Sequence, residues 1–318
     1  MQSYATVTTH TPQIILIGSY LVALVMDVDR IPLKGETLLA RNFREAYGGK
    51  GSDMAVQAAR LGAPVKFVGR VGEDDFGRAF IRLMQDEGVN LDYLGTTKEM
   101  LTGAGFIIKD RTGHNIITVD IGANQLFVPA DVDRAAPEMR PGSVVLIQLE
   151  IPLETALHAA KLGHHAGGTV IFNPAPAQDL RGHDLSSMDI LTPNETEARI
   201  CLGLSPTDPT PDIEIARQLL AHGCHTVVMT LGERGSVIVT ADSVTEVPAY
   251  YFPDAVDSNG AGDSFNAALA TGLIEGKSLY DAARFANAVA GLCCTRWDTV
   301  PSYHNRQEVN QFLQQQGS

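Results

Sequence analysis

The chain has 318 residues with 24 basic and 37 acidic side chains, which gives a formal net charge of −13. Because the lysines and arginines are also scattered rather than clustered, we expect neither a nucleic acid nor an anionic membrane as a partner. The length predicts one large hydrophobic core with a smaller appendage rather than two full domains.

Short apolar segments rich in β-branched residues alternate with helical patterns along most of the chain. We interpret the apolar segments as buried strands at residues 14–17, 65–68, 144–149, 169–172, 226–231 and 236–239. Helical patterns lie between many of them, at residues 52–61, 76–87, 153–165 and 212–222. This alternation predicts an α/β fold in which helices cover both faces of a mainly parallel sheet.

Two stretches interrupt the alternation, at residues 21–47 and 102–122. Apolar and polar residues alternate there around turn signals such as Lys34-Gly35 and Asp110-Arg111-Thr112-Gly113, which predicts antiparallel strands outside the main sheet. The two stretches can pair into one small sheet that covers a cleft as a lid. An edge extension or a dimer surface would show the same pattern, so the sequence leaves the role of these strands open.

The first glycine cluster is Gly48-Gly49-Lys50-Gly51-Ser52-Asp53, at the start of a predicted helix. It is not a Walker A loop, because Arg44 stands where the first glycine is required and Gly51 follows Lys50 where serine or threonine is required. Adjacent glycines let a ligand approach the backbone closely, and Lys50 and Asp53 can then bond the hydroxyls of a polyol. Taken alone, the cluster is better explained as a turn before a helix.

Two further motifs stand at the ends of predicted elements. The segment Asn194-Glu195-Thr196-Glu197 begins a helix and offers amide and carboxylate oxygens suited to the water shell of Mg²⁺. Residues 230–235, Thr-Leu-Gly-Glu-Arg-Gly, follow a buried strand, and α/β folds bind ligands at the carboxyl ends of their strands. Each motif alone is better explained as a capped helix or a turn.

The most informative segment is Asp257-Ser258-Asn259-Gly260-Ala261-Gly262-Asp263, a glycine-rich turn that opens a helix. The N–H groups of the turn and the positive end of the helix dipole can face an anion. The carboxylate of Asp263 can accept the proton of a substrate hydroxyl while that hydroxyl attacks a nucleoside triphosphate. The segment therefore suits phosphoryl transfer, with a plain turn and a helix that favours an early aspartate as the alternative.

The remaining composition bears on the cellular compartment. The four cysteines have neither the spacing of a metal site nor that of a disulfide framework, so we expect reduced and mostly buried thiols. Residues 1–12 lack the basic start and apolar stretch of a signal peptide, and no apolar run is long enough to span a membrane. These features predict a cytoplasmic protein. The cysteines are Cys201, Cys224, Cys293 and Cys294.

In their joint order the motifs resemble the ribokinase family of carbohydrate kinases, also called the PfkB family. The resemblance runs from Gly18-Ser19 to about Pro301 and includes Ala-Arg-Leu-Gly at 59–62, Val-Gly-Glu-Asp-Asp-Phe-Gly at 71–77, Gly-Ala-Asn at 122–124, Asn-Pro-Ala-Pro-Ala at 173–177 and Arg-Phe-Ala-Asn-Ala at 284–288. It implies a three-layer α/β sandwich with a mainly parallel central sheet and a small β-sheet lid. Residues 13–20, 48–101 and 123–318 would form the nucleotide- and substrate-binding core, and residues 21–47 and 102–122 the lid.

The resemblance implies a kinase that transfers the γ-phosphate of ATP to a hydroxyl of a small sugar. In that family pattern Asp263 is the general base, and the amides of Gly260, Ala261 and Gly262 form the anion hole. The implied nucleotide contacts are Asn194, Thr230, Gly232, Gly235 and Asn287; the implied sugar contacts are Gly49, Lys50, Asp53, Glu150 and Asp263; and Glu197 is linked to Mg²⁺, through water. Lid edges in this family often pair, which implies a homodimer through the lid.

Three residues depart from the family pattern at the sugar site. Leu21 and Ala23 occupy positions where ribokinases usually carry an asparagine and a sugar-binding aspartate, and Asp53 replaces a usual asparagine. An ionised carboxylate accepts hydrogen bonds but donates none, so Asp53 changes which substrate groups fit. We therefore expect a modified or bulkier carbohydrate, with an apolar group at Leu21 and Ala23 and a donor or cation at Asp53.

The family's K⁺ site is altered as well. The resemblance implies a monovalent-cation site at Asp257 and Asn259, where Asn259 replaces threonine. The later cation-binding segment reads Trp-Asp-Thr-Val-Pro-Ser at residues 297–302, which departs from the family's Gly-Ala-x-x-Ser. Asp298 either adds a ligand or carries its charge into a remodelled loop.

Two other functions remain open from the sequence. A nucleoside kinase of the same fold is favoured if Leu21 and Ala23 face a base. A catalytically weak sugar-binding or regulatory protein would keep the fold, although retention of Asp263 argues against it.

Overall fold

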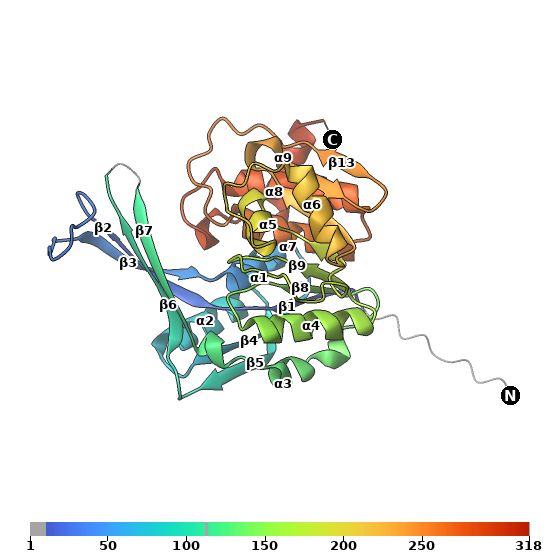
Figure 1. Cartoon of the computed structure of the whole chain (residues 1–318). Coiled ribbons are helices and arrows are strands. Elements are labelled where there is room, and N and C mark those ends of the chain that lie inside the picture. The colour runs from blue at the N-terminus through green and yellow to red at the C-terminus, as the bar shows by residue number, and fades with distance from the viewer. Residues whose placement is uncertain (1–10, 112–113, 318) are drawn as a thin grey trace.

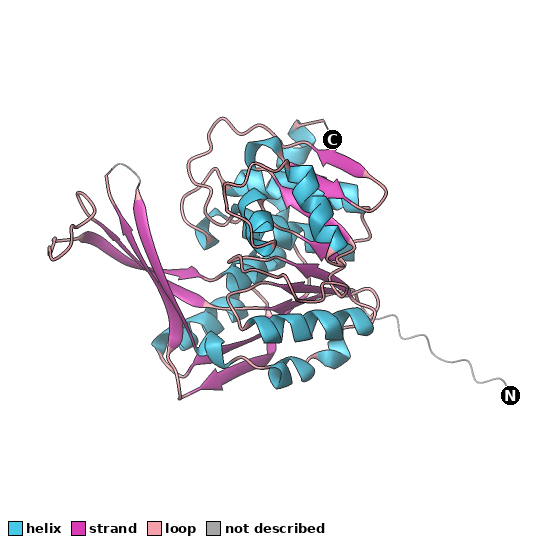
Figure 2. Ribbon diagram, in the orientation of Figure 1, coloured by secondary structure: helices cyan, strands magenta, loops and turns pink. Residues whose placement is uncertain are grey.

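The computed structural model describes residues 11–111 and 114–317, and these form a three-layer α/β sandwich with a separate small sheet (Figures 1 and 2). The central sheet has the strand order β13-β12-β11-β10-β9-β8-β1-β4-β5. All of its neighbouring strands are parallel except at β11–β12 and β12–β13. The predicted α/β fold with a mainly parallel sheet is therefore confirmed. The strands are β1 Ile14–Ile17, β4 Val65–Gly72, β5 Asn90–Thr97, β8 Val144–Ile147, β9 Thr169–Phe172, β10 Ile190–Leu191, β11 Thr226–Thr230, β12 Ser236–Val239 and β13 Val244–Val247.

Strand β1 shows why the apolar segments become central strands. All four of its residues are fully buried, and β1 pairs in parallel with β4 on one side and β8 on the other. Because side chains alternate across a strand, Ile14 and Leu16 enter one hydrophobic core while Ile15 and Ile17 enter the other. The sheet thus separates two cores, each closed by its own layer of helices.

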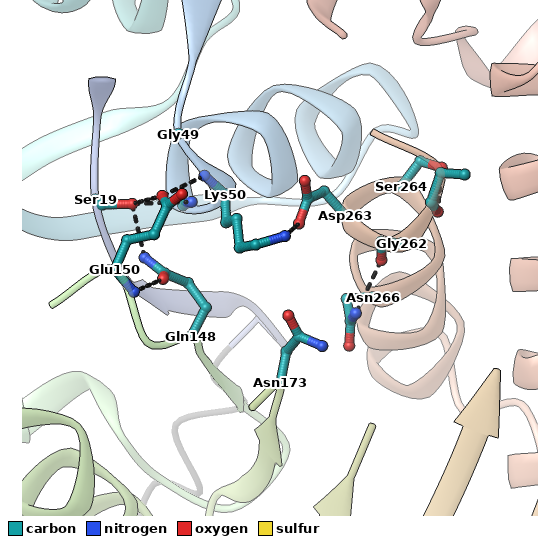
Figure 3. Close-up of polar contacts among 12 residues, drawn as sticks. Ser19, Gly49, Lys50, Gln148, Glu150, Asn173, Gly262, Asp263, Ser264 and Asn266 are labelled. Carbon is teal, nitrogen blue, oxygen red and sulfur yellow. Dashed lines mark hydrogen bonds and ion pairs between the residues drawn. The ribbon is translucent and has the colours of Figure 1, made fainter. Parts of the chain in front are cut away.

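The helices divide between the two faces of the central sheet. Helices α1 Lys50–Arg60, α2 Asp75–Asp86, α7 Ala261–Ile274, α8 Leu279–Cys293 and α9 Arg306–Gln315 contribute to the core that contains Ile14. Helices α3 Pro129–Asp133, α4 Leu153–His165, α5 Glu195–Cys201 and α6 Asp212–Ala221 contribute to the core that contains Ile15. The starts of α1 and α7 lie beside one another on the same face (Figure 3).

The second sheet projects from one side of the sandwich and is built from the two stretches that broke the α/β alternation (Figure 1). Its strands are β2 Leu21–Asp27, β3 Arg41–Gly48, β6 Thr102–Lys109 and β7 Asn115–Gly122, in the order β3-β2-β6-β7. The antiparallel prediction holds for β2–β3 and β6–β7 but is wrong for β2–β6, which pair in parallel. The sheet consists of two antiparallel hairpins, β2–β3 and β6–β7. The hairpins join through their first strands, β2 and β6, which lie side by side and run in the same direction.

Some sequence predictions concern residues outside the described ranges. Residues 1–10, which belong to the segment without signal-peptide features, are among them, as are residues 112 and 113 of the turn predicted at 110–113. Within the described ranges no helix is long and apolar enough to cross a membrane. The four cysteines are free thiols, three of them buried and Cys294 half-buried, as predicted.

Candidate active site

The glycine-rich turn at residues 257–263 is a tight entry into helix α7. Gly260 caps the helix with φ 78°, a left-handed conformation that glycine adopts without steric cost. A Cβ atom at this position would lie 2.6 Å from the hydroxyl oxygen of Tyr303, so the turn is packed against the protein as well as bent. In the first turn of the helix, Asp263 is only 7% exposed. The sequence therefore places a carboxylate at a rigid, buried helix start.

The cluster at residues 48–53 is also rigid rather than a flexible turn. Gly49 has φ 91°, and a Cβ there would meet the backbone nitrogen of Leu21 at 2.7 Å. A Cβ at Gly51 would meet the backbone nitrogen of Ser19 at 2.4 Å. These glycines let the start of α1 lie directly on the junction between β1 and β2, which fixes Lys50 in position.

A polar network holds the start of α1 from the other side (Figure 3). The Glu150 carboxylate accepts hydrogen bonds from the Ser19 hydroxyl at 2.6 Å and from the Lys50 backbone N–H at 2.8 Å. The Gln148 side-chain amide donates to the Ser19 hydroxyl oxygen at 2.8 Å, and its carbonyl accepts from the Glu150 backbone N–H. Glu150, predicted as a sugar contact, therefore also anchors Lys50.

The Lys50 side chain crosses from α1 toward α7 and its ammonium lies 3.7 Å from the Asp263 carboxylate (Figure 3). Burial raises the pKa of the Asp263 carboxyl to about 6, although the charge of Lys50 acts in the opposite direction. The same pairing raises the pKa of Lys50. Asp263 is thus a carboxylate whose proton affinity is tuned toward neutral pH, as general-base catalysis requires.

Two cavities meet at the start of α7. One is lined by the predicted sugar contacts Gly49, Lys50, Asp53, Glu150 and Asp263, together with Gly260. The other is lined by Ala261 and Gly262 from the same turn. The predicted nucleotide contacts also line the second cavity: Asn194, Thr230, Gly232, Gly235 and Asn287. Residues that lie far apart in the chain are therefore gathered as the resemblance implied, with one helix start between the two groups.

The three amides of the predicted anion hole are not equally available. The Ala261 N–H donates to the Ser258 carbonyl oxygen at 3.2 Å. The N–H groups of Gly260 and Gly262 have no such acceptor within the described part of the chain. These two amides are free to bind an anion in the geometry shown, and Ala261 must exchange its long bond to do so.

Asn194 and Glu197 form a capping box at the start of α5. The Asn194 side-chain oxygen accepts from the Glu197 N–H at 2.8 Å, and Glu197 Oε2 accepts from the Asn194 N–H at 2.8 Å. The predicted Mg²⁺ motif thus has a structural role that accounts for both residues. Among the described residues Glu197 Oε1 makes no hydrogen bond. Glu197 is not among the residues that line either cavity, whereas Asn194, Glu195 and Thr196 line the second one.

Two other predicted nucleotide contacts, Asn287 and Gly235, contact the backbone at the end of β13. The Asn287 side-chain amide donates to the carbonyls of Val247 and Pro248, at 2.9 and 3.2 Å, and so fixes the segment that follows β13. Gly235 has φ 91°, and a Cβ there would lie 2.3 Å from the Val247 oxygen. Both residues therefore shape the wall of the second cavity.

The residues predicted for a monovalent cation do not form a side-chain ligand set. Asp257 Oδ1 accepts from the Asn259 N–H at 3.0 Å, and Oδ2 accepts from the Asp298 N–H at 3.1 Å. Asp298 has φ 67°, and its carboxylate faces Arg44 at 3.4 Å and Lys109 at 4.0 Å, both on the small sheet. Asp257 and Asp298 thus hold this loop through protein contacts, and the predicted cation site stays a prediction.

Several site residues were missed by the sequence reasoning. Gln148 lies within the strand predicted at residues 144–149 and directly follows the observed strand β8, so a polar residue at the end of an apolar segment could have marked it. Tyr303 has no motif signal, and its place under Gly260 depends on the fold. The second cavity is further lined by three aromatic side chains at residues 250–252, in a segment without regular secondary structure: Tyr250, Tyr251 and Phe252.

Known proteins resemble this chain over most of its length. Over 299 residues the chain is 36% identical to a ribokinase of Haemophilus influenzae, which covers 94% of this chain and 97% of the relative. It is 35% identical over 304 residues to a deoxyribokinase of Salmonella typhi, covering 94% and 98%. The solved structure of Arabidopsis thaliana ribokinase complexed with ribose and ATP is similar with a TM-score of 0.84 and 31% identity, covering 96% and 99%.

The family match spans nearly all of the described core and both hairpins of the small sheet. It extends over residues 11–306 and corresponds to the family described as pfkB family carbohydrate kinase. Such kinases are phosphotransferases with an alcohol group as acceptor. The chain belongs to the pfkB family of carbohydrate kinases.

Proposed function

We propose that this carbohydrate kinase transfers the γ-phosphate of ATP to a sugar hydroxyl across the start of helix α7. The observation that carries the proposal is the division of one turn between two cavities. Gly260 and Asp263 line the cavity with the sugar-site residues, whereas Ala261 and Gly262 line the cavity with the nucleotide-site residues. A hydroxyl in the first cavity and a phosphate in the second would meet at this turn.

Asp263 is the proposed general base. It accepts the hydroxyl proton while the sugar oxygen forms its bond to the γ-phosphorus and the bond from that phosphorus to the β,γ-bridging oxygen breaks. The positive charge of Lys50 lowers the pKa of Asp263 and so favours its ionised form, and the Glu150 carboxylate accepts a hydrogen bond from the Lys50 backbone N–H. Gly49 and Asp53 complete the proposed set of sugar contacts.

The amides of Gly260, Ala261 and Gly262 are the proposed anion hole for the transferring group. Glu197 Oε1 would hold Mg²⁺ through a water, and the metal would supply charge neutralisation on the phosphates. Asn194, Thr230, Gly232, Gly235 and Asn287 are the proposed walls of the ATP site. The proposed mechanism assigns no step to a monovalent cation, and Asp257 accepts hydrogen bonds from the N–H groups of Asn259 and Asp298.

A coupled assay of ADP release tests the proposed function. The purified full chain is assayed with pentoses, hexoses, amino sugars and nucleosides, with and without Mg²⁺ and with and without K⁺. Sugar-dependent ADP release that needs Mg²⁺ and not K⁺ supports the mechanism. ADP release that depends on nucleosides rather than sugars would identify the protein as a nucleoside kinase. Ligand binding without ADP release across the whole panel would favour a regulatory protein.

The pKa of Asp263 makes the reaction pH-dependent. The base acts when ionised, so we expect kcat/KM for the sugar to fall as the pH drops through about 6 and to level off above it. Because the charge of Lys50 lowers this pKa, Lys50→Met moves the acidic limb to higher pH. The matched change Lys109→Met, in the same cavity but facing Asp298, leaves the limb nearly in place. An acidic limb that Lys50→Met does not move contradicts the assignment.

We further propose that the small sheet, residues 21–47 and 102–122, is a lid over the sugar cavity and that two copies pair through it. Residues of β2, β3, β6 and β7 line that cavity, so the sheet can close it against water. Large apolar side chains are exposed on the strands of the sheet and in the loop between β2 and β3, and two of them, Ile117 and Val119, also line the sugar cavity. They are Leu33, Leu39, Phe43, Phe106, Ile116, Ile117 and Val119. If two copies of the chain buried these apolar side chains against one another, the loss of exposed apolar surface would stabilise a dimer.

Sedimentation velocity tests the pairing. The wild type is expected to sediment as a dimer at micromolar concentration, and Ile116→Asp, an exposed position of β7 that is not among the lining residues of the sugar cavity, as a monomer. The matched control Val244→Asp also places a charge on an exposed apolar strand position, but on β13 at the far edge of the central sheet, and stays dimeric. A monomeric wild type excludes the dimer.

A further inference from the structure

Asp53 is a buried carboxylate without a complete set of partners. It lies in the first turn of α1, is 3% exposed, and lines the sugar cavity. Its Oδ1 atom is buried and has no hydrogen-bond partner in the described part of the protein. Leaving a buried acceptor unpaired is costly, so the arrangement indicates that a ligand group completes it.

The charges around this cavity do not balance. Four carboxylates line it, those of Asp53, Glu150, Asp263 and Asp298, with only two ammonium groups, those of Lys50 and Lys109. The Lys50 ammonium lies 3.7 Å from Asp263. The Lys109 ammonium faces Asp298. Asp53 is consequently the carboxylate of the cavity that a cationic substrate group would compensate.

The wall formed by β2 supplies no polar partner. Leu21, Ala23 and Val25, which alternate along β2 and are apolar, line the same cavity. A fully hydroxylated sugar would leave hydroxyls against this wall without hydrogen bonds, which costs binding free energy. The cavity thus suits a substrate with an apolar edge on one side and a charged hydrogen-bond donor on the other.

We propose that the acceptor is an aminated carbohydrate whose ammonium group pairs with Asp53, while a less polar edge lies along β2. This inference rests on the proposed function of the cavity as the sugar site. It assigns Asp53 as the residue that selects the substrate and leaves proton transfer to Asp263.

The electrostatics of the cavity agree with the pairing. Burial and the charges of Asp263 and Glu150 raise the pKa of Asp53, whereas Lys50 and a hydrogen bond with Thr299 lower it. Tyr20 and Tyr303 also face this carboxyl, and both have pKa values raised by burial. An ammonium at hydrogen-bond distance favours the ionised form of Asp53, so the substrate and the carboxylate stabilise one another. A neutral sugar offers no positive charge to favour the ionised form of Asp53.

Matched sugar pairs test the proposal in the full-length enzyme. Glucosamine, galactosamine and mannosamine are compared with glucose, galactose and mannose, and with their N-acetyl forms, in which the amine is a neutral amide. Each is assayed for ADP release with Mg-ATP, and its binding is measured by calorimetry without nucleotide. The variants are Asp53→Asn and, as a control, Asp75→Asn, which changes an exposed aspartate in the first turn of α2.

We expect at least one amine to exceed its hydroxyl counterpart in kcat/KM by about tenfold or more, and its N-acetyl form to lose this advantage. Asp53→Asn should remove the advantage, while Asp75→Asn should keep it. A wild-type enzyme that prefers the neutral sugars, with the same ranking in Asp53→Asn, overturns the inference but leaves the kinase function standing. Amine binding that depends on Asp53 without any ADP release supports the inference and instead refutes the proposed reaction.

Discussion

Replacing Asp263 by asparagine is expected to lower kcat by about 10³-fold and to change sugar affinity little. The amide keeps the size of the carboxylate but cannot accept the hydroxyl proton at the moment of attack. The buried position of the residue makes replacement by a solvent base ineffective, since only 7% of it is exposed. Steady-state rates of ADP release and calorimetric sugar binding measure the two quantities separately.

A second carboxylate of the same cavity provides the control. Asp298 lines the cavity but faces Arg44 and Lys109, so Asp298→Asn should lower kcat by less than about tenfold. If Asp263→Asn retains more than about a tenth of the wild-type kcat, Asp263 is not the base. Equal losses in the two variants would point to a general effect of charge in the cavity.

The central strands could be predicted because their pattern is local. Residues 14–17 and 169–172 are short, apolar and bounded by turn residues, and both ranges match the observed strands. Strand β10 has only two residues, and β13 carries exposed polar side chains, so neither shows a buried-strand pattern. The parallel pairing of β2 with β6 was missed because it joins segments about eighty residues apart and leaves no local signal.

The candidate site divides in the same way. Gly260, Asp263 and Lys50 belong to glycine-rich motifs, and such motifs can be recognised in the sequence because glycine permits the tight backbone turns that they need. By contrast, the contact of Gln148 with Ser19 and the place of Tyr303 under Gly260 depend on packing between distant segments. The sequence also could not show that Asp257 is engaged by the N–H of Asp298, because that bond requires the positive φ of a remodelled loop.

Among the residues of the anion hole, Gly260 is the one at which substitution by alanine should disturb the structure most. A Cβ would lie 2.6 Å from the Tyr303 hydroxyl oxygen and 3.2 Å from its ring carbons, and the φ of 78° already disfavours a side chain. We expect Gly260→Ala to displace the turn and lower kcat by about 10²-fold, as loss of an anion-hole donor does in other enzymes. The thermal midpoint should fall as well, since both Tyr303 and the turn are packed.

The steric cause predicts a specific rescue. The Tyr303 hydroxyl is buried and has no hydrogen-bond partner in the described ranges, so Tyr303→Phe alone should be neutral or stabilising. In the double variant the nearest obstacle to the new methyl group is removed and the ring carbons at 3.2 Å need only a small shift. The double-mutant cycle should therefore show a favourable coupling of about 1 kcal/mol in stability and a partial return of kcat.

Gly262 separates this steric effect from a general sensitivity of the turn. A Cβ at Gly262 meets nothing within 4 Å, so Gly262→Ala should leave the free energy of unfolding within about 0.5 kcal/mol of the wild type. If Gly262→Ala destabilises as much as Gly260→Ala, or if Tyr303→Phe gives no coupling, then the contact with Tyr303 does not set the turn. If Tyr303→Phe rescues Gly260→Ala while Gly262→Ala remains as stable as the wild type, then packing against Tyr303 sets the conformation of the anion-hole turn.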